Sequence, residues 1–173
     1  EKLDFTWFEA PLPDYDFAGY KKITNSVGIK IIPSGNWVVD LQRFSEAINN
    51  KVWSATRTDM AMIGGITNCK KAMDLSDIGG LHCEIMSWGY TLVSVANLHL
   101  MLSSNNCSFY EQPLPYETFE FGMHDVLRTN KDGYMYAPTK PGLGVEINWD
   151  QMKTRVIHSF YCDKNKEVGL VHV

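Results

Sequence analysis

The sequence predicts an α/β fold in which parallel strands alternate with helices. Between residues 1 and 115, five short runs of β-branched and aromatic residues each lead to a turn signal, and all but the last then lead to an apolar pattern with helical spacing. The unit recurs at intervals of roughly 25 to 30 residues, as strand-helix crossovers do. Such crossovers place the C-terminal ends of all strands on one edge, where an eight-stranded barrel or an open sheet carries its functional site.

The first strand covers residues 3–9, where apolar and polar side chains alternate up to Glu9. Pro11 follows two positions later and prevents continued pairing, so Glu9 stands at the strand end. Residues 107–115 repeat this design, because Glu111 again precedes a Pro-Leu-Pro segment. Two strands that end in a carboxylate on one edge indicate a site.

The remaining elements follow from caps, glycines and prolines. Gly28 ends the first helix, and Asp40 is a suitable N-cap for the second. The tail after residue 115 breaks the rhythm with Gly, Pro and aromatic residues and is expected to form an ordered wrap. The expected helices cover 14–27, 40 to about 48, 66–76 and 91–103, and the expected strands cover 29–33, 52–58, 81–86 and 108–111.

The composition is that of a globular domain without a basic surface. The 173 residues are 45% hydrophobic and 21% charged, with a formal net charge of -4. The 16 Lys and Arg are spread along the chain, so we expect no nucleic acid and no membrane as partner. Four cysteines lie far apart without a metal-binding spacing, which predicts reduced, buried thiols in a cytoplasmic protein.

Three of the expected strand ends carry a carboxylate, on Glu9, Asp59 and Glu111. Ionised carboxylates on one edge repel one another unless a cation or hydrogen-bond donors compensate them. Oxygen ligands without His or Cys favour Mg²⁺ or Mn²⁺, so a bound divalent metal is one explanation. The alternative is that these residues cap helices or are solvated, and the pattern alone favours neither.

Three motifs occur in order along the chain: Trp7-Phe8-Glu9-Ala10-Pro11, Asp59-Met60-Ala61-Met62-Ile63-Gly64-Gly65 and Pro141-Gly142-Leu143-Gly144-Val145. Together they resemble the C-terminal part of the enolase superfamily, in its mandelate racemase-like branch. In that family the first motif ends barrel strand four, the second ends strand six, and the third lies in a tail that packs on the capping domain.

The resemblance implies how the chain is divided. Residues 1–115 would form the C-terminal portion, about strands four to eight, of a TIM-type (β/α) barrel. Residues 116–173 would be a C-terminal wrapping segment that packs on the barrel and the capping domain. The N-terminal capping domain and the first barrel strands would lie outside this sequence.

The resemblance also implies a chemistry, the Mg²⁺-dependent removal of the proton α to a carboxylate to give a metal-stabilised enediolate. Glu9 would be a metal ligand, and Asp59 would orient or tune the base at the end of strand seven. Glu111 would hydrogen-bond the substrate carboxylate or the enediolate, which requires Glu111 to carry a proton. Tyr110, beside the rim, is either a substrate-binding residue or a packed aromatic side chain.

One departure from the family pattern lies at the end of strand five. The family has Gly-Glu there, and the Glu is a metal ligand, whereas this chain has Ser34-Gly35-Asn36-Trp37. One alignment leaves Gly35 in the ligand position, and the other places Asn36 there, with a neutral amide oxygen. Either alignment removes one negative charge and predicts weaker Mg²⁺ binding.

A second departure lies at the end of strand seven, where Met86 occupies the position of the family's catalytic His. A thioether cannot transfer a proton at neutral pH, so this half of the acid/base pair is absent. His82 lies near the start of the same strand and is expected to be structural. Glu84 shares a strand face with Met86 and is the candidate for a polar substrate-binding group inside the barrel.

These features favour an acid-sugar dehydratase, a lyase acting on a sugar-acid substrate, because dehydration can use a single base from outside this sequence. A racemase, epimerase or cycloisomerase of the same superfamily is the alternative enzyme. A non-catalytic member that binds a carboxylate ligand is the third hypothesis, since two site positions are altered. We expect a homo-oligomeric full-length protein, and we expect the isolated 173 residues to self-associate through unpaired sheet edges.

Overall fold

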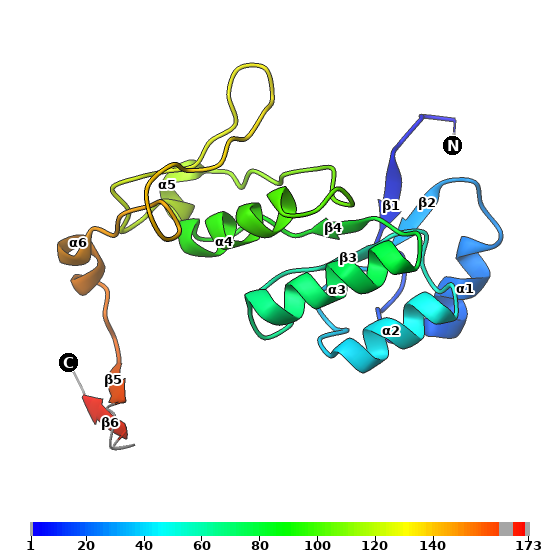
Figure 1. Cartoon of the computed structure of the whole chain (residues 1–173), viewed down its shortest axis with the longest axis horizontal. Helices are drawn as coiled ribbons and strands as arrows, with labels where there is room; N and C mark the ends of the chain where they lie inside the picture. Colours follow the sequence, from blue (N-terminus) through cyan, green and yellow to red (C-terminus); the bar gives the residue numbers. More distant parts are fainter. Residues whose placement is uncertain (1, 163–167, 172–173) are drawn as a thin grey trace.

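The computed structural model describes residues 2–162 and 168–171 and shows the expected alternation of strands and helices (Figure 1). Each of the first four strands is followed by a helix. None of the described helices is both long and apolar enough to cross a membrane. The elements are β1 (Trp7–Glu9), α1 (Phe17–Thr24), β2 (Lys30–Ile32), α2 (Leu41–Asn49), β3 (Thr56–Thr58), α3 (Ile66–Ile78), β4 (Cys83–Ile85), α4 (Thr91–Leu102), α5 (Tyr116–Phe119), α6 (Trp149–Lys153), β5 (Ser159–Cys162) and β6 (Val168–Val171).

The first four strands join in two parallel pairs. β1 pairs with β2, and β3 pairs with β4, where Arg57 lies opposite Glu84. Between the pairs, the Ser54 N–H donates to Ile31 O at 2.9 Å, and Ser54 Oγ accepts from the Ile31 N–H at 3.0 Å. Parallel pairing brings neighbouring strand ends together, as the alternation of strands and helices predicted.

The expected fifth strand is not a regular strand, although its segment lies beside β4. The Cys83 N–H donates to Asn106 O at 2.7 Å, but beyond this bond a side chain replaces the backbone ladder. The Glu84 carboxylate accepts from the N–H groups of Ser108 and Phe109 at 3.0 and 3.3 Å. These N–H groups are therefore not available to the carbonyl groups of β4, and the prediction of a strand here was wrong.

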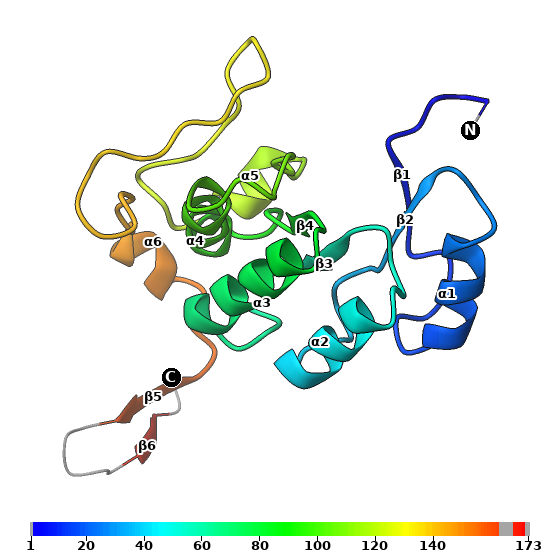
Figure 2. The ribbon, with the colours of Figure 1, turned by 45° about the vertical axis from the view of Figure 1, so that its right-hand side comes forward.

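A hydrophobic core lies between the strands and helices α1 to α4, which follow one another along one side of the strands (Figures 1 and 2). Trp53 is its largest ring, with centroids 5.6 Å from Phe17 and 6.3 Å from both Tyr20 and Phe44. Burial of such a side chain contributes about 2 kcal/mol, so this aromatic cluster fixes α1 and α2 against the strands.

Three cysteines are free thiols at this core or its border. Cys69 and Cys83 are buried, and Cys107 is half-buried. Burial raises the pKa of the Cys83 thiol to about 11 and that of the Cys107 thiol to about 12. These thiols stay neutral at physiological pH, which suits packing rather than nucleophilic chemistry. The side chain of Cys162 lies outside the described part of the chain.

Two of the predicted helices begin at aspartate caps. Asp40 caps α2 as expected, and its carboxylate accepts the Arg43 N–H at 2.8 Å. The first helix begins at Phe17, three residues later than predicted. The reason is that Asp16 is its N-cap and accepts the Gly19 N–H at 2.8 Å, so the residues before it stay outside the helix.

The tail after residue 115 packs along α4 and then leaves it. His99 Nε2 on α4 lies 3.1 Å from Leu143 O, which fixes the Pro-Gly-Leu-Gly-Val motif to that helix. Gly144 has a φ of +79°, and a Cβ there would lie 2.4 Å from Pro138 Cβ, so only glycine fits this turn. The β5–β6 hairpin lies apart from the other elements in both views (Figures 1 and 2). Packing of the tail on a capping domain stays a prediction.

Asp14 is a buried carboxylate that holds the loop after β2. It accepts hydrogen bonds from the Ser34 N–H at 2.8 Å, from the Ser34 hydroxyl at 2.7 Å and from the Gly35 N–H at 3.1 Å. The Tyr20 hydroxyl lies 3.4 Å from the same carboxylate. Hydrogen bonds to a charged acceptor are worth about 1.5–3 kcal/mol, so Asp14 determines the conformation of this loop.

We expect Asp14→Ala to lower the free energy of unfolding by roughly 3 kcal/mol, because the donors of the β2 loop lose their buried acceptor. Asp16→Ala, which removes only a helix cap, should cost about 1 kcal/mol. Urea unfolding of both variants measures the difference. Equal losses would contradict the role of Asp14 as the support of this loop.

Candidate active site

The edge formed by the strand ends brings one cation and two carboxylates together. Arg57 on β3 is buried, with 4% of its surface exposed, and its Nη2 lies 3.7 Å from Glu9 Oε2 at the end of β1. The same Nη2 donates a hydrogen bond to Glu111 Oε1. Arg57 therefore joins two carboxylates that the sequence placed at separate strand ends. We call these three residues the ion cluster.

Two aromatic rings, Trp7 and Phe109, form a layer beside the ion cluster. Trp7 precedes Glu9 by two residues, and Phe109 precedes Glu111 by two, so each ring shares a face with its carboxylate. The two rings meet edge to face, with centroids 5.0 Å apart. This ring contact joins the two segments that carry Glu9 and Glu111.

Sequence reasoning missed Arg57. The available signal was a charged residue inside β3, a strand whose residues are all buried, because such a residue requires a buried partner of opposite charge. Gly35 leaves the space that Arg57 occupies. Its φ is +82°, and a Cβ there would lie 3.0 Å from Arg57 Cγ and 3.1 Å from the Arg57 backbone. The positive φ and the close approach of Arg57 therefore require a glycine at position 35. This holds for both alignments of the strand-five ligand.

Asp59 and Met86 lie at neighbouring strand ends. The Met86 N–H donates to Thr58 O at 3.0 Å, which continues the β3–β4 ladder to this edge. Both residues are buried. Asp59 Oδ1 accepts the Met62 N–H at 2.7 Å and so shapes the turn that leads to α3. The structure places Met86 beside the strand end that carries Asp59, where the sequence register put it.

Glu84 lies opposite Arg57 in the strand register, but its carboxylate contacts other residues. Besides the two N–H groups that it binds in the segment beside β4, it lies 3.3 Å from His82 Nδ1. That nitrogen also lies 3.1 Å from Ser108 Oγ. Within the described residues Glu84 forms no ion pair with Arg57, and its carboxylate bonds to the segment beside β4. A role of Glu84 in substrate binding stays a prediction.

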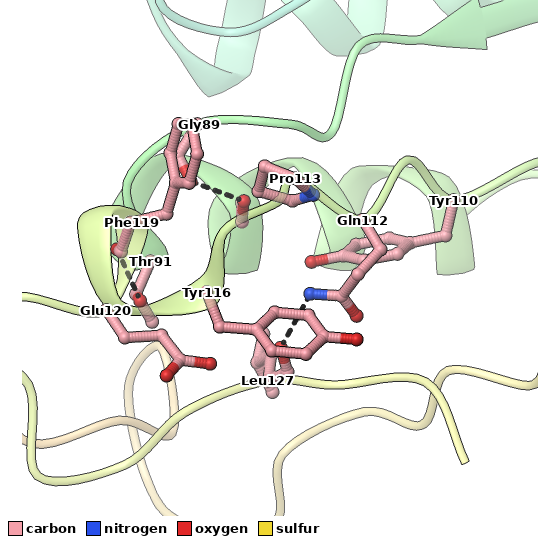
Figure 3. Close-up of a pocket in the computed structure, with 10 residues that line it drawn as sticks. Gly89, Thr91, Tyr110, Gln112, Pro113, Tyr116, Phe119, Glu120 and Leu127 are labelled. Carbon is pink, nitrogen blue, oxygen red and sulfur yellow. Dashed lines mark hydrogen bonds between the residues drawn. The ribbon is translucent and has the colours of Figure 1, made fainter. Parts of the chain in front are cut away.

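Tyr110 lies on the other face of its segment from Glu111. It packs against the hydrophobic core beneath α4 and lines a cavity of about 10 Å³ with Gln112 and Tyr116 (Figure 3). That volume holds about one water molecule and not a sugar acid. Burial raises the pKa of the Tyr110 hydroxyl. The structure does not bring Tyr110 to the ion cluster, because adjacent residues of an extended segment point to opposite faces.

Comparison with known proteins identifies the family. The sequence profile of the enolase C-terminal domain-like family matches residues 1–151. The chain belongs to the enolase superfamily. RspA of Pantoea ananatis (strain LMG 20103), a D-galactonate dehydratase family member, is 33% identical over 126 residues, which are 68% of this chain and 28% of RspA.

Solved structures place the chain in the mandelate racemase-like branch of the enolase superfamily. A protein from Pseudovibrio sp., described as a mandelate racemase/muconate lactonizing enzyme, has a TM-score of 0.88 at 35% identity, over 99% of this chain and 44% of its own. D-glucarate dehydratase from Agrobacterium tumefaciens, complexed with magnesium, has a TM-score of 0.78 at 26% identity, over 88% and 40%. The chain thus spans less than half the length of these relatives, and the family predicted from three motifs is confirmed.

A Mg²⁺ site in this enolase superfamily member would draw on Glu9 and Asn36. Asn36 follows the loop that Asp14 holds, and its N–H donates to Ser34 Oγ at 3.2 Å. A carboxylate oxygen and an amide oxygen suit Mg²⁺, but within residues 2–162 and 168–171 no group of three or more His, Cys, Asp and Glu side chains could hold a metal. Arg57 also compensates Glu9. The donors fit Mg²⁺ in kind, and further ligands would have to come from other parts of the protein.

We expect Arg57→Met to lower the free energy of unfolding by about 3 kcal/mol, because two carboxylates lose the cation between them. Arg43→Met breaks an exposed pair with Glu46 and should cost less than about 1 kcal/mol. The double variant Arg57→Met/Glu111→Leu should regain part of the loss, since one uncompensated charge is removed. Chemical denaturation measures all three, and a loss at Arg57 no larger than at Arg43 would refute the ion cluster.

Proposed function

We propose that this protein is a Mg²⁺-dependent acid-sugar dehydratase, a lyase that removes the proton α to a carboxylate and expels a β-hydroxyl as water. Its substrate would be a small polyhydroxylated carboxylate. Two of the similar proteins support this, since one is a D-galactonate dehydratase family member and another is a D-glucarate dehydratase. Because the chain spans only part of their length, the proposal concerns the whole protein.

The position of Met86 supports dehydration over racemisation. It stands at the end of β4, beside the strand end that carries Asp59. A two-base racemase or epimerase needs a proton-transferring group on each side of the α-carbon, and a thioether is neither acid nor base at neutral pH. Loss of a β-hydroxyl after removal of the α-proton can use one base, which other parts of the protein would supply. Met86 is therefore tolerable in a dehydratase.

Glu9 and Asn36 would hold the Mg²⁺ ion. When bound, Mg²⁺ supplies positive charge that stabilises the enediolate. The Glu9 side chain is 40% exposed and lies 3.7 Å from Arg57, so it can turn toward a metal without breaking a close hydrogen bond. Asn36 brings no charge, so Mg²⁺ should bind less tightly than to a site with a carboxylate at this position.

Arg57 and Glu111 would contact the substrate. Glu111 Oε2 and Arg57 Nε are both buried and have no hydrogen-bond partner within the described residues. The carboxylate oxygen can accept from a substrate hydroxyl, and the guanidinium can donate to a substrate oxygen. The other oxygen of the Glu111 carboxylate is paired with Arg57, so these two side chains would meet the substrate together.

We expect calorimetry on the whole protein to detect Mg²⁺ binding that Glu9→Gln abolishes. Asn36→Glu should tighten this binding by about tenfold or more, because a carboxylate replaces a neutral ligand. Asn36→Gln is the matched control and should not tighten it. An absence of Mg²⁺ binding in both the wild type and Asn36→Glu would remove the metal from the proposal.

We expect the whole protein with Mg²⁺ to convert at least one sugar acid to its 2-keto-3-deoxy product, measured by mass spectrometry as the loss of one water. The same reactions in D₂O separate the alternatives. Exchange of the α-proton that gives only a stereoisomer would favour a racemase or epimerase, and a constitutional isomer of the substrate would favour a cycloisomerase. Saturable binding of sugar acids with neither exchange nor product would favour a non-catalytic carboxylate-binding protein.

A further inference from the structure

Helix α4 carries three buried polar residues among mostly apolar ones. Thr91, Ser94 and Asn97 recur every third position, which places them on one side of the helix. Their exposed fractions are 6%, 4% and 0%. Thr91 Oγ1 donates to Phe119 O at 3.2 Å, at the pocket that Figure 3 shows. We call these three residues the polar ladder.

Asn97 joins the ends of β3 and β4. Its Oδ1 accepts the Met60 N–H at 3.0 Å, and its Nδ2 donates to Met86 O at 2.9 Å. Met60 directly follows Asp59. One buried amide side chain therefore fixes the backbone next to Asp59 to the end of the neighbouring strand, and both of its polar atoms are satisfied.

Ser94 extends this connection to Glu111. Its hydroxyl donates to Ser87 O at 2.5 Å and lies 3.3 Å from Gly89 O, in the loop after β4. The Ser87 hydroxyl in turn accepts the Glu111 N–H at 2.5 Å and lies 3.3 Å from Glu111 O. Both backbone polar groups of Glu111 thus contact Ser87, whose own carbonyl is held by α4.

We propose that Asn97 and Ser94 are positioning residues that set Asp59 and Glu111 relative to one another. The inference rests on the proposed function, because that function places Glu111 at the substrate, and Asp59 is the carboxylate at the strand end beside Met86. Asp59 lies beyond the last residue of β3, and the segment that carries Glu111 is not a strand, so α4 is the rigid element that fixes both. Misplacement of a reacting group by about 1 Å can reduce the rate by about a hundredfold.

Asn106 provides a matched control. It is 5% exposed, and its Nδ2 donates to Met73 O at 2.9 Å and lies 3.4 Å from Leu81 O. The backbone carbonyl of Asn106 accepts the Cys83 N–H at the start of β4, and Met86 lies at the other end of that strand. Asn106 therefore resembles Asn97 in type and burial, and it also donates to backbone carbonyls, but it lies at the opposite end of β4 from Met86.

Amide hydrogen exchange in the whole protein tests the connection without an activity assay. In Asn97→Leu, exchange at Met60 should accelerate by about tenfold or more, whereas Asn106→Leu should leave it within about twofold. Ser94→Ala should accelerate exchange at Glu111, and Ser94→Thr, which keeps the hydroxyl, should not. Should Asn97→Leu fail to fold, Asn97→Ala also removes the acceptor of the Met60 N–H and adds no bulk to the buried site. Unchanged exchange at both amides would overturn the proposal.

Turnover of a sugar acid separates positioning from packing. Asn97→Leu and Ser94→Ala should lower kcat by about tenfold or more with KM within about threefold, whereas Asn106→Leu should leave kcat within about twofold at a similar loss of Tm. Equal losses of kcat in Asn97→Leu and Asn106→Leu would overturn the positioning role. If the wild type turns over no sugar acid, the proposed function fails, and the exchange experiment still decides whether the polar ladder holds this edge.

Discussion

The arrangement of charges at the strand ends depends on one buried guanidinium, that of Arg57. Arg57 lies between Glu9 and Glu111, which would otherwise be uncompensated negative charges above an aromatic layer. Other features follow from its presence. Gly35 has no side chain because its backbone lies against Arg57, and Asp14 in turn holds the N–H of Gly35. The conformation of the loop after β2 is thus linked to the position of the Arg57 side chain.

The charges at this edge agree with the sugar-acid substrate that we propose. The family resemblance implies a Glu at the strand-five position, so Asn36 or Gly35 in its place would remove one negative charge. Arg57 adds a positive charge beside the remaining carboxylates. Both features make the edge less negative, which weakens the attraction for a divalent cation and strengthens that for a carboxylate. A sugar acid would meet a cation on the protein itself as well as on a bound metal.

The same edge is held by side chains where the strands have ended. The described strands β1 to β4 are short. The three carboxylates of this edge, Glu9, Asp59 and Glu111, lie at the last residue of a strand or outside the strands. Polar residues of α4 take over from the sheet and bond to the backbone beside Asp59 and, through Ser87, to that of Glu111. A buried polar group that is fully satisfied fixes geometry more narrowly than apolar packing does, since its bonds are directional.

The sequence by itself determined the features that depend on neighbouring residues. The alternation of strands and helices, the Asp40 cap, and Glu9 and Met86 at strand ends follow from local patterns, and three short motifs were enough to identify the family. Only the tertiary structure decided that Arg57 meets Glu111, 54 positions away, and that Asn97 meets Met60, 37 positions away. It also decided that the Glu84 carboxylate accepts hydrogen bonds from the N–H groups of Ser108 and Phe109. In a regular strand these N–H groups would bond to backbone carbonyls of β4. Such partners come together only when the chain folds, because burial makes each polar group bond to whichever group packing brings near it.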